Sequence, residues 1–134
     1  MHNLGFFERC KPDIVLFNVS GDIICGELAL PLRRELIGQV YLVTSSEFLP
    51  LHACNNLCKA IRRHAGRGGS KLGGLIYNAR GFIDQPAIVD KYARRIRAKV
   101  IDRIPRSPLI LEAEMHGKTV TEYAPSSDIA NLFR

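Results

Sequence analysis

Short apolar runs alternate with longer segments of helical periodicity along the chain. We expect strands in the apolar runs and helices in the segments between them. The expected strands are 14–17, 39–44, 72–78 and 100–104. The expected helices are the tail of one at 3–10, then 47–64, 86–98, 107–114 and one from 126 onwards, with an extended segment at 119–123. This alternation is typical of an α/β protein, and we expect a parallel sheet with helices on both faces.

Local signals mark the boundaries of these elements. Serines and an acidic residue at 45–47 are typical of a helix start, because a serine caps free backbone N–H groups and an acid complements the helix dipole. The glycine-rich stretch 66–70 is expected to end that helix. Gly73 and Gly74 indicate close packing against the third strand.

The composition fits one domain spanning residues 1–134. Of the 134 residues, 46% are hydrophobic, which is enough to form a core. No stretch approaches the ~20 apolar residues of a membrane-spanning helix, and the first residues lack the features of a signal peptide. We therefore expect a cytoplasmic protein. The four cysteines are scattered, so a disulfide framework is not expected, and a metal or cluster ligand is the sharper possibility.

The chain carries a formal net charge of +6. Nucleic acid is one class of partner that such a charge fits. However, the basic residues are spread over two helix segments, 62–67 and 91–99, without interleaved aromatic residues. Solvated helix faces explain this pattern better, so we expect neither a nucleic-acid nor a membrane partner.

Polar residues follow the first expected strand, where an α/β sheet places its ligands. Asp22 is a candidate for holding Mg²⁺ or sensing a phosphate, and the alternative is a turn residue that caps its own backbone. Cys25 is a candidate metal ligand, although one cysteine cannot hold an iron–sulfur cluster and a small buried residue is the alternative. Arg33 and Arg34 could dock an acidic partner or form a solvated face.

The ends of the third and fourth strands form a second constellation. Asn78 and the pair Pro105 and Arg106 are expected to lie at one edge of the sheet, where they could bracket a purine ring and its ribose. Hydrogen bonding within the loops is the alternative. Cys54 and Cys58 share a helix face and could bind zinc, but we expect them to pack as small apolar residues.

A phosphate cradle is missing from the chain. No Gly-x-x-x-x-Gly-Lys-Ser/Thr motif occurs. The glycine-rich segment 66–71 follows a helix, whereas a phosphate loop follows a strand and opens a helix. We interpret this segment as a turn.

Six stretches agree in order and spacing with one family over almost the whole chain. They are GDIICG at 21–26, ALPLR at 29–33, ACNN at 53–56, LGGLIYNAR at 72–80, IPR at 104–106 and TVTEYAP at 119–125. The chain resembles the nitrogenase iron protein and its relatives, including reductase components of chlorophyll and methanogen tetrapyrrole synthesis. This resemblance implies a P-loop NTPase-like fold and a homodimeric ATPase that passes single electrons to a catalytic partner protein.

The resemblance also implies roles for individual residues. It implies a [4Fe–4S] cluster shared across the homodimer, with Cys25 as the second ligand of each subunit, and MgATP as the nucleotide. Asp22 matches the end of the switch that links the nucleotide to the cluster. Arg33 matches a position that docks the partner. The adenine-side contacts correspond to Asn78, Pro105 and Arg106.

The chain departs from the family pattern at several places. Asn18 stands at a catalytic position where the family usually has an aspartate, so an amide replaces the carboxylate that would contact metal or activate water. Glu27 replaces a usual glycine beside the cluster ligand. The phosphate-loop strand would lie before Met1, so we expect a partial fold that lacks this strand, is inactive alone and is marginally stable. A non-catalytic interaction domain and a partition-type ATPase relative without a redox role are the alternative functions.

Overall fold

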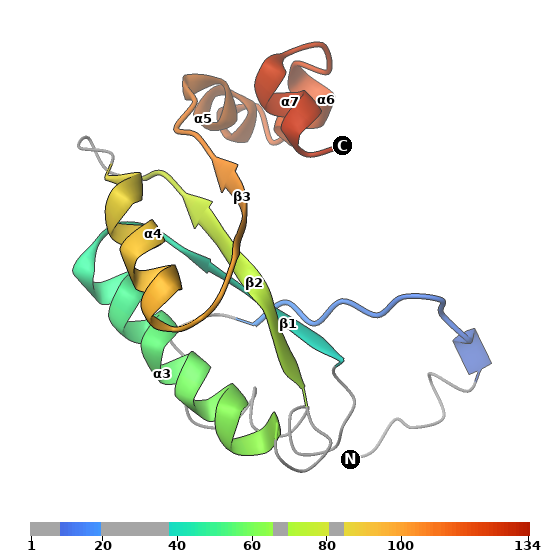
Figure 1. Cartoon of the computed structure of the whole chain (residues 1–134). Coiled ribbons are helices and arrows are strands. Elements are labelled where there is room, and N and C mark those ends of the chain that lie inside the picture. The colour runs from blue at the N-terminus through green and yellow to red at the C-terminus, as the bar shows by residue number, and fades with distance from the viewer. Residues whose placement is uncertain (1–8, 20–37, 66–69, 81–84) are drawn as a thin grey trace.

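A parallel sheet of three strands organises the described part of the chain. The computed structural model describes residues 9–19, 38–65, 70–80 and 85–134, and all structural statements concern these residues. The strands are β1 (Gln39–Thr44), β2 (Lys71–Asn78) and β3 (Val100–Ile104), hydrogen-bonded in the order β1-β2-β3 (Figure 1). Both pairs are parallel, with one register irregularity in each.

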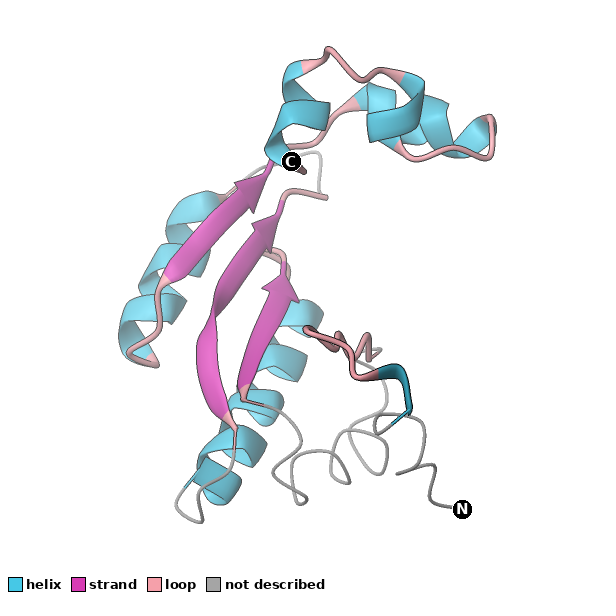
Figure 2. Ribbon diagram, turned by 90° about the vertical axis from the view of Figure 1, so that its right-hand side faces the viewer, coloured by secondary structure: helices cyan, strands magenta, loops and turns pink. Residues whose placement is uncertain are grey.

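Two helices connect these strands and cover one face of the sheet. Helix α3 (Phe48–Ala65) leads from β1 to β2, and helix α4 (Pro86–Arg95) leads from β2 to β3. Figure 2 shows both helices behind the same side of the sheet. The strand order explains this arrangement, because two right-handed crossovers that step in the same direction place their helices on the same face. The described residues thus contain one of the two helical layers that we expect.

The main core lies between this face and the helices. Strand β1 alternates strictly: Val40, Leu42 and Thr44 are buried, whereas Tyr41 and Val43 are 50% and 61% exposed on the other face. Successive side chains of a strand point to opposite faces, so burial of one face alone gives the pattern with a period of two from which this strand was predicted. The buried residues of this core come from β1, α3, β2 and the C-terminal end of α4. They are Val40, Leu42, Cys54, Cys58, Ile61, Leu75, Ala93 and Ile96.

Three short helices follow β3. They are α5 (Pro108–Met115), α6 (Val120–Tyr123) and α7 (Asp128–Leu132). They bury Ala113, Val120 and Ile129 in a cluster of their own, against which Ile104 at the end of β3 packs. Figure 1 shows them beyond the carboxyl end of β3. No helix in the described part of the chain combines the length and apolarity that crossing a bilayer requires.

Most predicted boundaries are confirmed within a residue. The strands at 39–44 and 100–104 are confirmed, and the third begins one residue early. The long helix is shifted by one residue at each end. The helix expected at 86–98 ends at Arg95, because Ile96 is its cap and Arg97 adopts a positive φ of 52° that no α-helix continues.

The prediction of an extended segment at 119–123 is wrong, because helix α6 forms there. The three consecutive β-branched residues, Thr119, Val120 and Thr121, favoured a strand. Instead, the backbone N–H and the hydroxyl of Thr119 both donate to the carboxylate of Glu122, over 2.9 and 2.8 Å. This pairing of a cap threonine with a glutamate three residues later belongs to the capping box, a helix-start signal.

The strand expected at 14–17 is also wrong. Residues 11–19 form no regular element, and Ile14 and Leu16 are 79% and 90% exposed. An apolar run becomes a buried strand only where neighbouring backbone pairs with it. No described segment pairs with this one, and Figure 1 shows it as an irregular trace between the short N-terminal helical turn and the sheet. Of the helix tail expected at 3–10, only residues 9–10 are described, and they are helical.

Candidate functional site

The carboxyl ends of β2 and β3 bring together Asn78, Pro105 and Arg106. Asn78 is the register partner of Ile104, the last residue of β3. The backbone N–H of Ala79 donates to the carbonyl of Ile104 over 2.9 Å, which holds the two strand ends at the same level. Because Pro105 and Arg106 follow at once, all three residues lie at one edge of the sheet, as the sequence predicts.

The chain leaves β3 abruptly at this edge. Pro105 lacks an N–H group and cannot extend the ladder. Ser107 is the extended N-cap of α5, and Pro108 opens that helix, where its missing N–H costs nothing. Arg106 therefore lies between a strand end and a helix start, in a link of three residues whose ends are both fixed.

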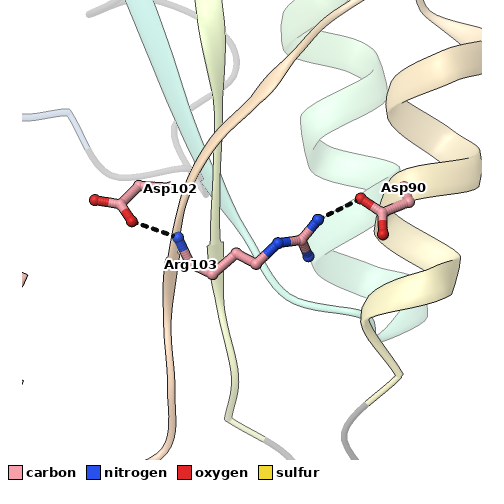
Figure 3. A network of polar contacts seen from close by, with 3 residues as sticks. All are labelled: Asp90, Asp102 and Arg103. Atoms are coloured by element: carbon pink, nitrogen blue, oxygen red, sulfur yellow. Dashed lines mark hydrogen bonds and ion pairs between the residues drawn. The ribbon is translucent and has the colours of Figure 1, made fainter.

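Helix α4 packs against β2 and β3 near the same edge of the sheet. The side chain of Tyr77, 3% exposed, packs with Ala79 and Val89. Arg103, the register partner of Tyr77, donates to the carboxylate of Asp90 on α4 over 2.6 Å (Figure 3). Side chains exposed by 45% and 34% make this ion pair worth at most about 1 kcal/mol. It therefore positions the helix more than it stabilises the fold.

The remaining predicted site residues do not join this edge in the described structure. Asp22, Cys25 and Arg33 lie outside the described residues, as does Glu27. Asn18 is described, and it is exposed within the irregular segment rather than placed at the end of a strand. The expected position of Asn18 at a strand end is therefore wrong.

The described cysteines do not form a metal centre. Among the described residues, no group of three or more His, Cys, Asp or Glu side chains could hold a metal ion. Cys10 is exposed, whereas Cys54 and Cys58 are each 3% exposed in the main core, where the sequence expects them to pack. Two thiols fall short of the four thiolates that a [4Fe–4S] cluster takes.

The two buried thiols are chemically unequal. The hydrogen bond with Cys54 lowers the pKa of the Cys58 thiol to about 7, helped by Tyr92 and Arg62. The same bond and burial raise the pKa of Cys54 far above its ordinary value. The Tyr92 hydroxyl lies 3.9 Å from Cys58 Sγ, and burial raises its own pKa. Sequence reasoning missed this cluster, because Tyr92 comes from another helix and only the spacing of the two cysteines was visible.

The whole chain matches a family of known proteins. A sequence model of the "4Fe-4S iron sulfur cluster binding proteins, NifH/frxC family" matches residues 1–134. A nitrogenase iron protein 2 of Methanothermococcus thermolithotrophicus is 45% identical over 134 residues, all of this chain and 46% of the relative. A nitrogenase iron protein of Methanococcus voltae is 42% identical, again over all of this chain and 48% of the relative. The chain thus spans about half the length of the curated relatives it matches.

The fold also resembles a solved structure. The cell division ATPase MinD of Pyrococcus furiosus superposes with a TM-score of 0.55 and 21% identity, over 71% of this chain and 38% of MinD. At this identity the likeness supports the architecture alone: part of an α/β fold of the P-loop ATPase type. The family-model match over all 134 residues gives the assignment: the chain belongs to the NifH/frxC family of 4Fe–4S iron–sulfur cluster binding proteins.

Proposed function

We propose that the chain is part of an ATP-dependent reductase component that passes single electrons from a [4Fe–4S] cluster to a catalytic partner protein. The family match over all 134 residues carries this proposal. The protein would act as a homodimer, because a cluster with four ligands and two from each chain needs two subunits. The reducing cytoplasm, which keeps thiols free, is the compartment we propose.

The nucleotide part of the proposal rests on the edge formed by β2 and β3. The amide of Asn78 offers both a donor and an acceptor, which suits the polar edge of adenine. The ring of Pro105 offers an apolar surface for the base, and Arg106 adds a positive charge and planar donors for the ribose–phosphate side. All three lie at the carboxyl ends of parallel strands, where folds of this type bind ligands.

The cluster part of the proposal rests on residues outside the described structure. By the resemblance to the family, Cys25 would be a cluster ligand, and the described cysteines, Cys10, Cys54 and Cys58, have no such role in this proposal. The cluster, when bound, would supply one-electron transfer. Asp22 lies three residues before Cys25, so a small shift of Asp22 on nucleotide binding or hydrolysis would move the ligand. Asn18 would act as an amide rather than as a carboxylate, and Arg33 would dock the partner.

Reconstitution of the protein expressed from its complete reading frame tests the proposal. The protein is treated anaerobically with iron and sulfide, and iron content and the spectrum of the reduced state are measured. We expect Cys25→Ser to lose both the iron and the spectrum. Cys10→Ser is the matched control, because it removes an exposed thiol and should retain both. Equal iron uptake by the two variants would show that the cluster assignment is wrong. ATP hydrolysis without iron uptake would instead support a partition-type ATPase relative, and neither hydrolysis nor iron uptake would support an interaction domain.

A further inference from the structure

A hollow lies between the outer surfaces of α3 and α4. Its volume is about 520 Å³, within the range of small-molecule sites. Its lining comes from both helices: Asn55, Lys59, Arg62, Tyr92, Arg95 and Ile96. Three of these six residues are cations and none is an acid, so the hollow carries a concentrated positive charge.

The cations of the hollow are available for a ligand. Neither Lys59 nor Arg95 forms an ion pair within the part of the chain that the structure describes. The ion pair found there joins Arg103 and Asp90. Arg62 donates to the carbonyl of Ile96 over 2.6 Å. Ile96 is the C-cap residue of α4, and the helix dipole places partial negative charge at this end of the helix. Arg62 offsets that partial charge, which leaves the full charges of Lys59 and Arg95 for a ligand.

The hollow is also partly preorganised. The bond from Arg62 to Ile96 ties α3 to the end of α4 and fixes one guanidinium nitrogen, while the others can still donate. The Tyr92 side chain is held by its contact with Cys58 in the core. The guanidinium of Arg62 and the ring of Tyr92 are thus already held in place before a ligand arrives, which reduces the ordering cost of binding.

We propose that this hollow binds a small phosphate-bearing anion with at least two negative charges, held by Lys59, Arg62 and Arg95. Two free cations require a ligand that carries at least two charges. Arginine favours phosphate because its planar fork meets two oxygens at once, and lysine adds a point charge. The side-chain amide of Asn55 supplies a further donor.

This site is separate from the edge assigned to the nucleotide. Helix α4 begins after the carboxyl end of β2 and runs back to the amino end of β3. Tyr92, Arg95 and Ile96 lie in its second half, towards the opposite edge of the sheet from Asn78 and Pro105. Binding here would therefore add an anion to the helical layer without occupying the proposed adenine contacts.

Calorimetric titration of the 134-residue chain with inorganic pyrophosphate tests the proposal at fixed ionic strength. We expect one site, and at least about a tenfold loss of affinity in the double variant Lys59→Gln/Arg95→Gln, because the anion loses two charged hydrogen-bond donors. The double variant Arg63→Gln/Arg94→Gln is the matched control. It removes the same charge from exposed positions next to the hollow residues on the same helices, and its affinity should change less than about twofold.

Three outcomes would overturn the proposal: no binding of pyrophosphate, equal losses in the two double variants, or equal affinity for a tricarboxylate of the same charge. Circular dichroism melts of both variants check that they fold. If the hollow variant does not fold, Lys59→Gln alone, on an exposed side chain, gives the same comparison against Arg63→Gln.

Discussion

Asn78 lies opposite Ile104 in the parallel register of β2 and β3, and this pairing places Asn78 at the level where the chain continues from β3 into Pro105. The backbone bond from Ala79 to Ile104 fixes the relationship just beyond the last pair. The amide is therefore held by two strands rather than by a loop. A side chain positioned in this way can select a base by hydrogen bonding, provided that this edge binds the nucleotide.

Asn78→Leu should weaken ATP binding by about tenfold, because a polar edge of the base would lose its partner, at about 1–2 kcal/mol. The variant has a similar shape and should fold. Calorimetry or fluorescence titration with MgATP on the protein from its complete reading frame measures the change. Asn131→Leu, on an exposed position of α7, is the control and should bind ATP normally. An unchanged affinity in Asn78→Leu would remove this residue from the nucleotide site.

Gly74→Ala should destabilise the chain more than Gly73→Ala. A Cβ at Gly74 would lie 2.5 Å from Cγ2 of Ile101 and 3.2 Å from the backbone carbonyl of Lys99. A Cβ at Gly73 would meet the ring of Tyr41 at 2.6 Å, but this half-exposed ring can move aside. We expect a loss of about 1–3 kcal/mol for Gly74→Ala and less for Gly73→Ala. Urea unfolding of both variants measures the difference, and the reverse order would contradict the explanation.

The sequence predicted those elements whose signals are local. The alternation of β1 and the periodicity of α3 lie within each segment, so both were recognised to within a residue. The irregular segment 11–19 was misjudged because a strand exists only where a distant segment pairs with it. Helix α6 was misjudged because the bond between Thr119 and Glu122 outweighs the strand preference of the residues between them.

Of the two candidate sites, one could be predicted from the sequence and the other could not. Asn78 and Pro105 could be placed together from the sequence, because parallel strands end at one edge. The cationic hollow could not be predicted, because Lys59 and Arg95 come from different helices and are 36 positions apart in the sequence. Only the packing of α3 against α4 brings those charges together.

The thiol pair should make stability depend on pH. The folded pair releases one proton near pH 7 and retains the other well above pH 9, whereas each free thiol has a pKa of 9.0. Between pH 7 and 9 the unfolded chain therefore binds more protons, so the free energy of unfolding should rise with pH, by up to about 3 kcal/mol. Above pH 9 the folded pair holds the extra proton, and the free energy of unfolding should fall.

Urea unfolding at several pH values measures this effect as the difference between the unchanged chain and Cys58→Ala. The substitution removes the first titration, so the rise between pH 7 and 9 should disappear from the variant. Cys10→Ala removes an exposed thiol and should leave the pH profile unchanged. A rise of equal size in Cys58→Ala would assign the pH dependence to other groups.

Substitutions at two neighbouring residues of β1 should lower the free energy of unfolding by very different amounts. Leu42 is 6% exposed in the core beneath the helices, whereas Val43 is 61% exposed on the open face. Leu42→Ala should therefore cost about 2–5 kcal/mol, and Val43→Thr, which keeps a β-branched side chain, should cost less than about 0.5 kcal/mol. Urea unfolding measures both losses.

The same open face should govern self-association. Besides Tyr41 and Val43, this face carries Ile101, which is 48% exposed. An exposed apolar sheet face of this kind favours association between copies of the chain. We expect the 134-residue chain to be marginally stable or to aggregate, and Val43→Thr to reduce aggregation in light scattering at equal concentration. Leu42→Ala should increase it, because unfolding exposes the core. A reversible, cooperative melt of a monomer in the unchanged chain would contradict this expectation, since it would show that the open face is tolerated without a covering partner.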